Sequence, residues 1–296
     1  MLGEQQVLKN INLNVNRGSI FALIGPNGAG KTTLIRSLTG IYNVDKGDIR
    51  VKGKEVYENP EVKKVIGYVA DENIYFSSFT VKEVIKFYSL AYDTFSKHRF
   101  NEINKIFQIP DKIAVRRLSK GMRTSFAIML SLCIMPELLI LDEPTSGLDP
   151  IIKKQVLNLL LEEVGERGTT IFISSHNLID LERICDFVAI INKGEIKYSS
   201  SIEDMKKNIR KLQVVFIDKA PQDLKTWREI LNLSQVGRVY NIITREYDDE
   251  FINKLENVGL ALMEEIDLSL EDMFIYSVGE ENVYGEVLKI KENLHE

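Results

Sequence analysis

The chain has 296 residues, of which 44% are hydrophobic and 27% are charged. These fractions are ordinary for a globular protein that buries a core in water. The formal net charge of −5 does not provide the basic surface that a nucleic-acid-binding protein needs. We therefore expect no nucleic-acid partner.

The cysteine content and the hydropathy pattern exclude two further classes. Cys133 and Cys185 lie in apolar stretches without the spacing of a metal site or a redox pair, which predicts buried free thiols in a reducing compartment. The chain begins with polar residues rather than a signal peptide, and its most apolar window, 126–141, is too broken to span a membrane. We expect a cytoplasmic protein that reaches the inner face of a membrane only through a partner.

The first half of the chain alternates strand-like and helix-like segments. Residues 11–16 alternate apolar and polar side chains, which predicts a half-buried strand. The continuous apolar run 20–24 is typical of a buried parallel strand, and a helix pattern follows over 32–38. Between residues 60 and 117 helical patterns at 81–90 and 99–107 dominate, which indicates a helical insertion over about 72–135.

The same α/β alternation resumes beyond this insertion. Apolar runs at 138–141, 169–174 and 187–191 predict further buried strands, and 151–167 has a helix pattern. The fold class expected from these elements is α/β with a mostly parallel sheet, in a domain over residues 1–205. The run G-P-N-G-A-G-K-T at 25–32, between the first buried strand and its helix, makes the expected type a P-loop NTPase.

A second domain is expected over residues 206–296. Strand patterns at 212–217 and 239–243 are mixed with helix patterns at 251–258 and 270–278. This combination predicts a small α+β accessory domain.

A glycine-rich motif over residues 25–32 carries the clearest chemistry. It fits G-x-x-x-x-G-K-[ST] between a buried strand and a helix. Its glycines allow the backbone N–H groups to surround phosphates, its lysine reaches the β- and γ-phosphates, and its threonine hydroxyl ligates Mg²⁺. ATP and Mg²⁺ are therefore the expected cofactors. The residues expected to bind the nucleotide are Gly25, Pro26, Asn27, Gly28, Ala29, Gly30, Lys31, Thr32 and Thr33.

Two consecutive carboxylates end the strand at 138–141. Asp142 and Glu143 emerge where parallel α/β sheets bind their ligands. Asp142 is the expected Mg²⁺ ligand together with Thr32, and Glu143 is the expected general base for the attacking water.

These motifs, with three others in order, resemble the nucleotide-binding subunits of ABC transporters over residues 1 to about 200. Residues 118–122, Leu-Ser-Lys-Gly-Met, resemble the family's signature, and Asp149 lies in a segment that resembles the D-loop. His176 resembles the switch histidine. The resemblance implies a dimer in which the signature of one subunit contacts ATP bound to the other. The expected signature contacts are Ser119, Lys120, Gly121 and Met122.

The resemblance also implies an activity and partners. The expected protein is an ATPase that drives transport through a separate membrane permease, with export favoured over uptake. Its second ATPase subunit is an identical or a related chain. Residues 65–90 match the stretch that docks the permease in the family, although an ordinary packed insertion is the alternative. The run 268–274 resembles the tail of subunits that serve small exporter-type permeases.

Three positions depart from the family pattern. Asp71 stands where a glutamine that touches Mg²⁺ is usual, which predicts a carboxylate ligand with altered coupling. Lys120 and Met122 replace a glycine and a glutamine of the signature. Leu2 stands where an aromatic residue stacks on adenine.

Two other functions were weighed against the transporter subunit. A soluble ABC ATPase acting on nucleic acid or the ribosome carries coiled coils or two such domains, and heptads are absent here. A P-loop kinase needs an acceptor-binding lid and lacks the signature over 118–122. The transporter subunit is the function that the motifs favour.

Overall fold

The computed structural model describes residues 6–71, 76, 78–176, 178–244 and 247–269. The chain forms two compact units, Met1–Ser199 and Ser200–Glu296, and each is described by itself. The strand expected over 11–16 is absent, because this segment pairs with no strand among the described residues.

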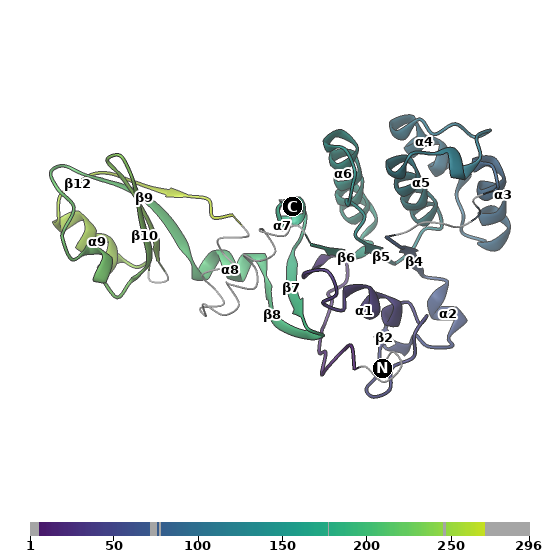
Figure 1. Cartoon of the computed structure of the whole chain (residues 1–296), viewed down its shortest axis with the longest axis horizontal. Helices are drawn as coiled ribbons and strands as arrows, with labels where there is room; N and C mark the ends of the chain where they lie inside the picture. Colours follow the sequence, from purple (N-terminus) through teal and green to yellow (C-terminus); the bar gives the residue numbers. More distant parts are fainter. Residues whose placement is uncertain (1–5, 72–75, 77, 177, 245–246, 270–296) are drawn as a thin grey trace. The chain divides into compact units, whose positions relative to one another are not determined.

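The first unit is built on a six-stranded sheet (Figure 1). The first five strands in spatial order pair in parallel with their neighbours, because helical crossovers connect them. In spatial order the strands are β4 (Ile66–Val69), β5 (Leu138–Asp142), β6 (Thr170–Ser175), β1 (Ile20–Ile24), β7 (Phe187–Asn192) and β8 (Glu195–Ser201).

Continuous burial explains why the central strands β1 and β6 are largely apolar. Every residue of β1 and β6 is buried. Phe21 stacks on Phe172 with ring centroids 5.5 Å apart, which joins the two strands at their side chains as well as at their backbones. The parallel sheet brings the carboxyl ends of β5 and β6 together, with Asp142 opposite Ser174.

Helices flank this sheet on both sides in Figure 1. One side has α1 (Lys31–Leu38) and α2 (Pro60–Lys63), and the other has α6 (Pro150–Arg167) and the helical insertion. A short helix, α7 (Leu178–Leu181), follows β6. The insertion contains α3 (Val81–Ala91), α4 (Lys97–Phe107), the 3₁₀ turn η1 (Val115–Arg117) and α5 (Lys120–Cys133).

Capping explains where the helices of the insertion begin. Thr80 and Glu83 form a capping box at the start of α3, and Ser96 caps α4. The Ser96 N–H donates to the Cys133 carbonyl at 2.8 Å, which attaches α4 to the end of α5. Both cysteines are buried and free, and burial raises the pKa of each thiol to about 12.

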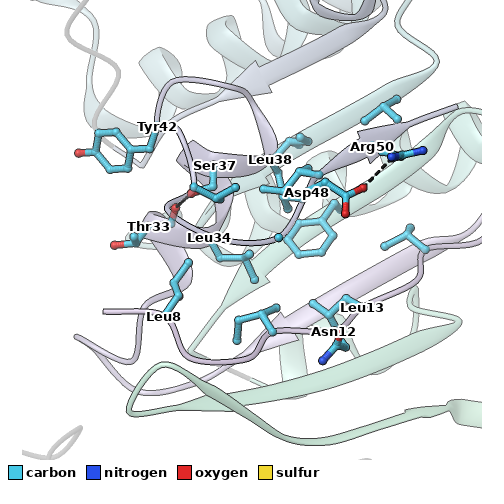
Figure 2. A pocket seen from close by; sticks show the side chains of 18 of the residues that line it. Leu8, Asn12, Leu13, Thr33, Leu34, Ser37, Leu38, Tyr42, Asp48 and Arg50 are labelled. Carbon is cyan, nitrogen blue, oxygen red and sulfur yellow. Dashed lines mark hydrogen bonds and ion pairs between the residues drawn. The ribbon is translucent and has the colours of Figure 1, made fainter. Parts of the chain in front are cut away.

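The segment expected to be a strand at 11–16 instead packs by side chains alone. Ile11, Leu13 and Val15 contact the core, which accounts for the alternation without requiring a paired backbone. A cavity of about 1170 Å³ lies beside this segment, and Figure 2 shows Leu13 and Leu34 on its wall. The two-stranded sheet of β2 (Arg50–Val51) and β3 (Lys54–Glu55) contributes Arg50 and Val51 to the lining.

The second unit is a four-stranded antiparallel sheet covered by a helix. Its strands follow the spatial order β10 (Ile230–Val236), β11 (Val239–Thr244), β9 (Arg210–Phe216) and β12 (Leu260–Ile266). Phe251 and Leu255 of α9 (Asp249–Asn257) pack on the apolar face of this sheet. The unit also contains α8 (Ile202–Asn208) and η2 (Leu224–Thr226), whereas the helix expected at 270–278 lies outside the described residues.

Candidate functional site

The phosphate-binding motif forms the turn between β1 and α1. Gly28 and Gly30 have positive φ angles of 77° and 108°, a conformation that side chains with a Cβ rarely adopt. A Cβ on Gly25 would lie 2.3 Å from the Ile191 carbonyl oxygen, so only glycine fits there. The local sequence therefore dictates a tight turn that leads into the N-terminus of α1. Leu2, expected near adenine, lies outside the described residues.

Lys31 is the buried cation of this turn, with only 6% of its side chain exposed. Its Nζ donates to the carbonyl oxygens of Gly25 at 2.7 Å and Pro26 at 3.2 Å. The same Nζ lies 3.1 Å from Oε1 of Glu143. The structure thus brings together the motif lysine and the carboxylate that sequence reasoning selected as the base.

Glu143 also contacts His176, the residue that resembles the switch histidine. His176 Nδ1 lies 2.7 Å from Glu143 Oε2, and the His176 backbone N–H donates to the same oxygen at 3.3 Å. Glu143 has a positive φ of 49°, which is uncommon for a residue with a side chain and accompanies functional sites. Lys31, Glu143 and His176 consequently form one continuous chain of polar contacts.

Asp142 points its carboxylate into the interior beside this chain. Its Oδ1 accepts a hydrogen bond from Ser174 Oγ at 2.6 Å. The Glu143 N–H donates to the same Ser174 hydroxyl at 3.1 Å. Sequence reasoning missed Ser174, although its place at the carboxyl end of the neighbouring strand was a usable signal. This serine fixes both carboxylate residues at once.

The second oxygen of Asp142 provides a test for a metal site. Oδ2 is buried and has no hydrogen-bond partner among the described residues, which fits a ligand atom for a cation. No group of three or more metal-ligating side chains occurs in the described part of the chain. Mg²⁺ commonly takes only one or two carboxylates, together with phosphates and water, so Asp142 fits such a site.

Two further expected metal ligands lie at the same edge of the sheet. Thr32 follows Lys31 in the first turn of α1 and is exposed. Asp71 is exposed and lies two residues beyond the end of β4. Because β4 runs parallel to β5, with Val69 opposite Leu141, Asp71 and Asp142 follow strands that end at one edge.

The signature segment forms the start of α5, which begins at Lys120. Ser119 is the N-cap, and its hydroxyl accepts a hydrogen bond from the Met122 N–H at 3.2 Å. Lys120 and Gly121 lie next to the D-loop segment, residues 146–149. A Cβ on Gly147 would be 3.2 Å from Lys120 Nζ, and a Cβ on Gly121 would be 3.5 Å from Leu148 Cδ2.

Asp149 caps α6 from the end of the D-loop. Its Oδ1 accepts hydrogen bonds from the N–H groups of Ile151 and Ile152, each at 3.0 Å. Over the described residues, no hydrogen bond or ion pair joins Ser119 or Asp149 to Lys31. The expected site residues therefore form two groups, one around the phosphate loop and one where the signature meets the D-loop.

Comparison with known proteins identifies the family. Residues 8–146 match the family model described as ABC transporter. The ABC transporter ATP-binding protein YtrB of Bacillus subtilis (strain 168) is 32% identical over 274 residues, which cover 93% of this chain and 94% of that protein. The bacitracin transport ATP-binding protein BcrA of Bacillus licheniformis is 36% identical over 71% of this chain and 70% of its own length.

A solved structure agrees with this assignment. The structure titled as an ATP-binding subunit of an ABC transporter superposes with a TM-score of 0.63 and 28% identity, covering 69% of this chain and 87% of its own. Among the helices of the described residues, none is long and apolar enough to cross a membrane. The chain belongs to the ABC transporter ATP-binding proteins, and it is the subunit that binds and hydrolyses ATP for a transporter.

Proposed function

We propose that the Lys31–Glu143–His176 chain is the hydrolytic centre that supplies energy for export through a separate permease. One observation carries the proposal: a single buried carboxylate contacts both the phosphate-loop lysine, at 3.1 Å, and the histidine, at 2.7 Å. Such convergence of a cation, a base and an orienting group is the arrangement that phosphoryl transfer to water requires.

Each residue has a separate role in this proposal. Lys31 and the backbone N–H groups of the glycine-rich turn bind the phosphates of ATP, with the N-terminus of α1 adding favourable dipoles. Glu143 accepts the proton of the attacking water. His176 orients the Glu143 carboxylate through its ring nitrogen and its backbone N–H.

Asp142 and Thr32 are the proposed protein ligands of Mg²⁺, with Asp71 as a third. When bound, Mg²⁺ neutralises charge on the β- and γ-phosphates. Ser174 holds the Asp142 carboxylate by its 2.6 Å hydrogen bond to Oδ1, which leaves Oδ2 available as a ligand atom.

A second ATPase subunit completes the site in this proposal. Ser119, Lys120, Gly121 and Met122 would contact the γ-phosphate of ATP that is bound to the partner. In support, Ser119 caps the 14-residue helix α5, whose N-terminal N–H groups are suited to an anion. The position of Lys120 Nζ, 3.2 Å from where a Cβ on Gly147 would lie, also places the signature beside the segment that contains Asp149 within one subunit.

Two substitutions test the hydrolytic centre. Glu143→Gln is expected to reduce ATP turnover by about 100-fold or more, because it removes the base. It should leave ATP bound and yield a stable dimer on size-exclusion chromatography with ATP. Lys31→Ala is expected to lose ATP binding itself, measured by equilibrium dialysis. Glu102→Gln, in an exposed pair on α4, is the control. Unchanged turnover in Glu143→Gln would refute the proposal.

The permease partner is proposed to dock on an aromatic surface of the helical insertion. Phe76 and Phe87 pack with ring centroids 4.9 Å apart, and Phe76 also contacts Phe79 at 5.4 Å. Phe79, Phe87 and Leu90 remain 45%, 48% and 76% exposed. A grouped apolar surface of this kind suits a protein interface, and the protein would then lie on the inner face of the cell membrane. BcrA, a relative named for bacitracin transport, supports export.

Phe87→Ser is the matching test of this surface. We expect the substitution to release the protein from membranes of its native host into the soluble fraction, because it removes an exposed ring from this surface. Ile151→Ser, at another strongly exposed apolar position, is the control. ATP turnover of the purified protein should stay within about twofold, since the ring is remote from the phosphate contacts. Equal membrane retention of both variants would contradict the docking proposal.

A further inference from the structure

Asp180 is a largely buried carboxylate that lies just beyond the hydrolytic centre. It belongs to α7, four residues after His176, and its side chain is 12% exposed. Its two oxygens lie 2.9 and 2.8 Å from Lys153 Nζ. The hydroxyl of Thr145 donates to Asp180 Oδ2 at 3.2 Å. None of the sequence motifs includes this residue.

The partners of Asp180 come from two segments that carry functional residues. Thr145 is 3% exposed and lies in the turn two residues after Glu143, where the Leu148 N–H donates to its carbonyl. Lys153 lies in the first turns of α6, and its own N–H donates to the Asp149 carbonyl at 2.9 Å. One carboxylate therefore connects the segment after Glu143, the helix after Asp149 and the helix after His176.

We propose that Asp180 is a positioning residue that maintains the 2.7 Å contact between His176 and Glu143. The backbone at Glu143 has a positive φ of 49°, so the direction of this side chain depends on the surrounding structure. Asp180 supplies that constraint from the histidine side of the contact. It touches neither ATP nor water in this role. The inference rests on the proposed roles of Glu143 and His176.

The charge pair is strong enough to act as such a constraint. Lys153 is 28% exposed and Asp180 is 12% exposed, so solvent screens the pair only partly. Both oxygens of the carboxylate face the ammonium group, which fixes the carboxylate plane and leaves Oδ2 for Thr145 as well. Loss of the charge should let the segment after His176 shift, and a shift of about 1 Å at a catalytic contact can cost as much as 100-fold in rate.

The test combines single variants with a charge reversal. Asp180→Ala is expected to lower kcat for ATP about 10- to 100-fold, with KM changed less than about twofold, because the phosphate contacts of Lys31 are untouched. Asp180→Asn, which is nearly isosteric and keeps an acceptor for Thr145, should lower kcat less. The single variants K153D and D180K should each lower kcat. The double variant K153D/D180K should recover part of that loss, since the pair is re-formed with reversed charges.

Matched controls separate positioning from stability. The pair between Lys254 and Glu229 in the second unit has similar geometry, with Nζ–O distances of 2.8 and 3.1 Å, and its reversal should leave kcat unchanged. Native kcat in Asp180→Ala would overturn the inference. So would equal losses of kcat, ATP affinity and melting temperature with no recovery in the double variant, because that pattern indicates a structural role alone.

Glu143→Gln, measured alongside, distinguishes failure of the inference from failure of the proposed function. If Glu143→Gln hydrolyses ATP at the native rate, the proposed centre is wrong, and the inference about Asp180 is wrong with it. If Glu143→Gln is inactive while both Asp180 variants and the charge reversal keep native kcat, only the role of Asp180 is refuted.

Discussion

Two buried ionic clusters lie at opposite edges of the same parallel sheet, and they differ in how fully their carboxylate oxygens are paired. At the carboxyl edge, Asp142 Oδ2 has no hydrogen-bond partner in the described part of the chain. At the amino edge, Glu163 is 0% exposed, and both of its oxygens are engaged. Since an unpaired buried oxygen costs stability, its retention at one edge indicates a function there.

The amino-edge cluster joins the helical insertion to the sheet. Glu163 of α6 forms ion pairs with Arg99 of α4 and with Arg167. It also accepts a hydrogen bond from Thr169 Oγ1 at 2.8 Å, immediately before β6. This cluster thus connects the insertion with the first residues of a core strand, whereas the carboxyl-edge cluster connects residues that are proposed to act on the nucleotide.

The largest effect that tests this contrast is expected at Glu163. Glu163→Ala should lower the free energy of unfolding by about 3 kcal/mol, because it leaves Arg99 and Arg167 without their shared carboxylate. The folded fraction should hydrolyse ATP within a few-fold of the native rate. Urea denaturation measures the first quantity and turnover per folded molecule the second. Glu102→Ala, in an exposed ion pair of α4, should leave the urea midpoint of unfolding unchanged. A loss of stability in Glu102→Ala as large as in Glu163→Ala would contradict the structural role of the amino-edge cluster.

At the carboxyl edge, Asp142→Asn should mainly change the response to metal. A ligand present at 100 times its Kd raises the free energy of unfolding by about 2.7 kcal/mol, so binding of ATP with Mg²⁺ is measurable as an increase in stability. We expect added Mg²⁺ to increase the stabilisation by ATP in the native protein but not in the variant, because the variant lacks the anionic ligand. Thermal melting with ATP and either Mg²⁺ or EDTA measures this. The control is Asp48→Asn, at an exposed ion pair. An undiminished Mg²⁺ effect in Asp142→Asn would exclude Asp142 as a ligand.

The smallest of the three effects is expected at Ser174. Ser174→Ala removes the 2.6 Å hydrogen bond to Asp142 and the acceptor of the Glu143 N–H. A loss of about 1.4 kcal/mol for such a bond corresponds to about a tenfold lower rate of hydrolysis. Ser131→Ala is the control, because among the described residues this buried hydroxyl donates only to the Tyr68 carbonyl, at 3.3 Å. Equal rates for the two variants would mean that Ser174 does not position the site.

Sequence was sufficient for the residues that a motif or a continuous apolar run defines. The turn at 25–32 and the carboxylates after residue 141 could be predicted because glycine, lysine and adjacent acids are dictated by local geometry and charge. The buried strands β1, β5, β6 and β7 were evident because each contains a continuous apolar run. Asp180 and Glu163 could not be found this way, and Ser174 was missed despite its place at the end of an apolar run, because each of the three has a partner more than 25 residues away in the chain.

The alternation at 11–16 shows the opposite case, in which a correct pattern gave a wrong element. Alternating burial requires only that every second side chain contacts the core, and Ile11, Leu13 and Val15 do so without a paired backbone. Strands β10 and β12 were missed because most of their residues are exposed or half-buried and partly polar. Their pairing is decided by β11 and β9, which sequence alone does not place beside them.

Lys31 has a consequence for affinity that follows from its existing partners. Its ammonium group already satisfies two carbonyl oxygens and one carboxylate. Any phosphate that engages Lys31 must compete with these three oxygens, so the favourable enthalpy of the new contact is reduced by the contacts that it displaces. The same exchange would release Oε1 of Glu143 from Lys31. Binding of a phosphate would thereby make this oxygen available to accept a proton from water.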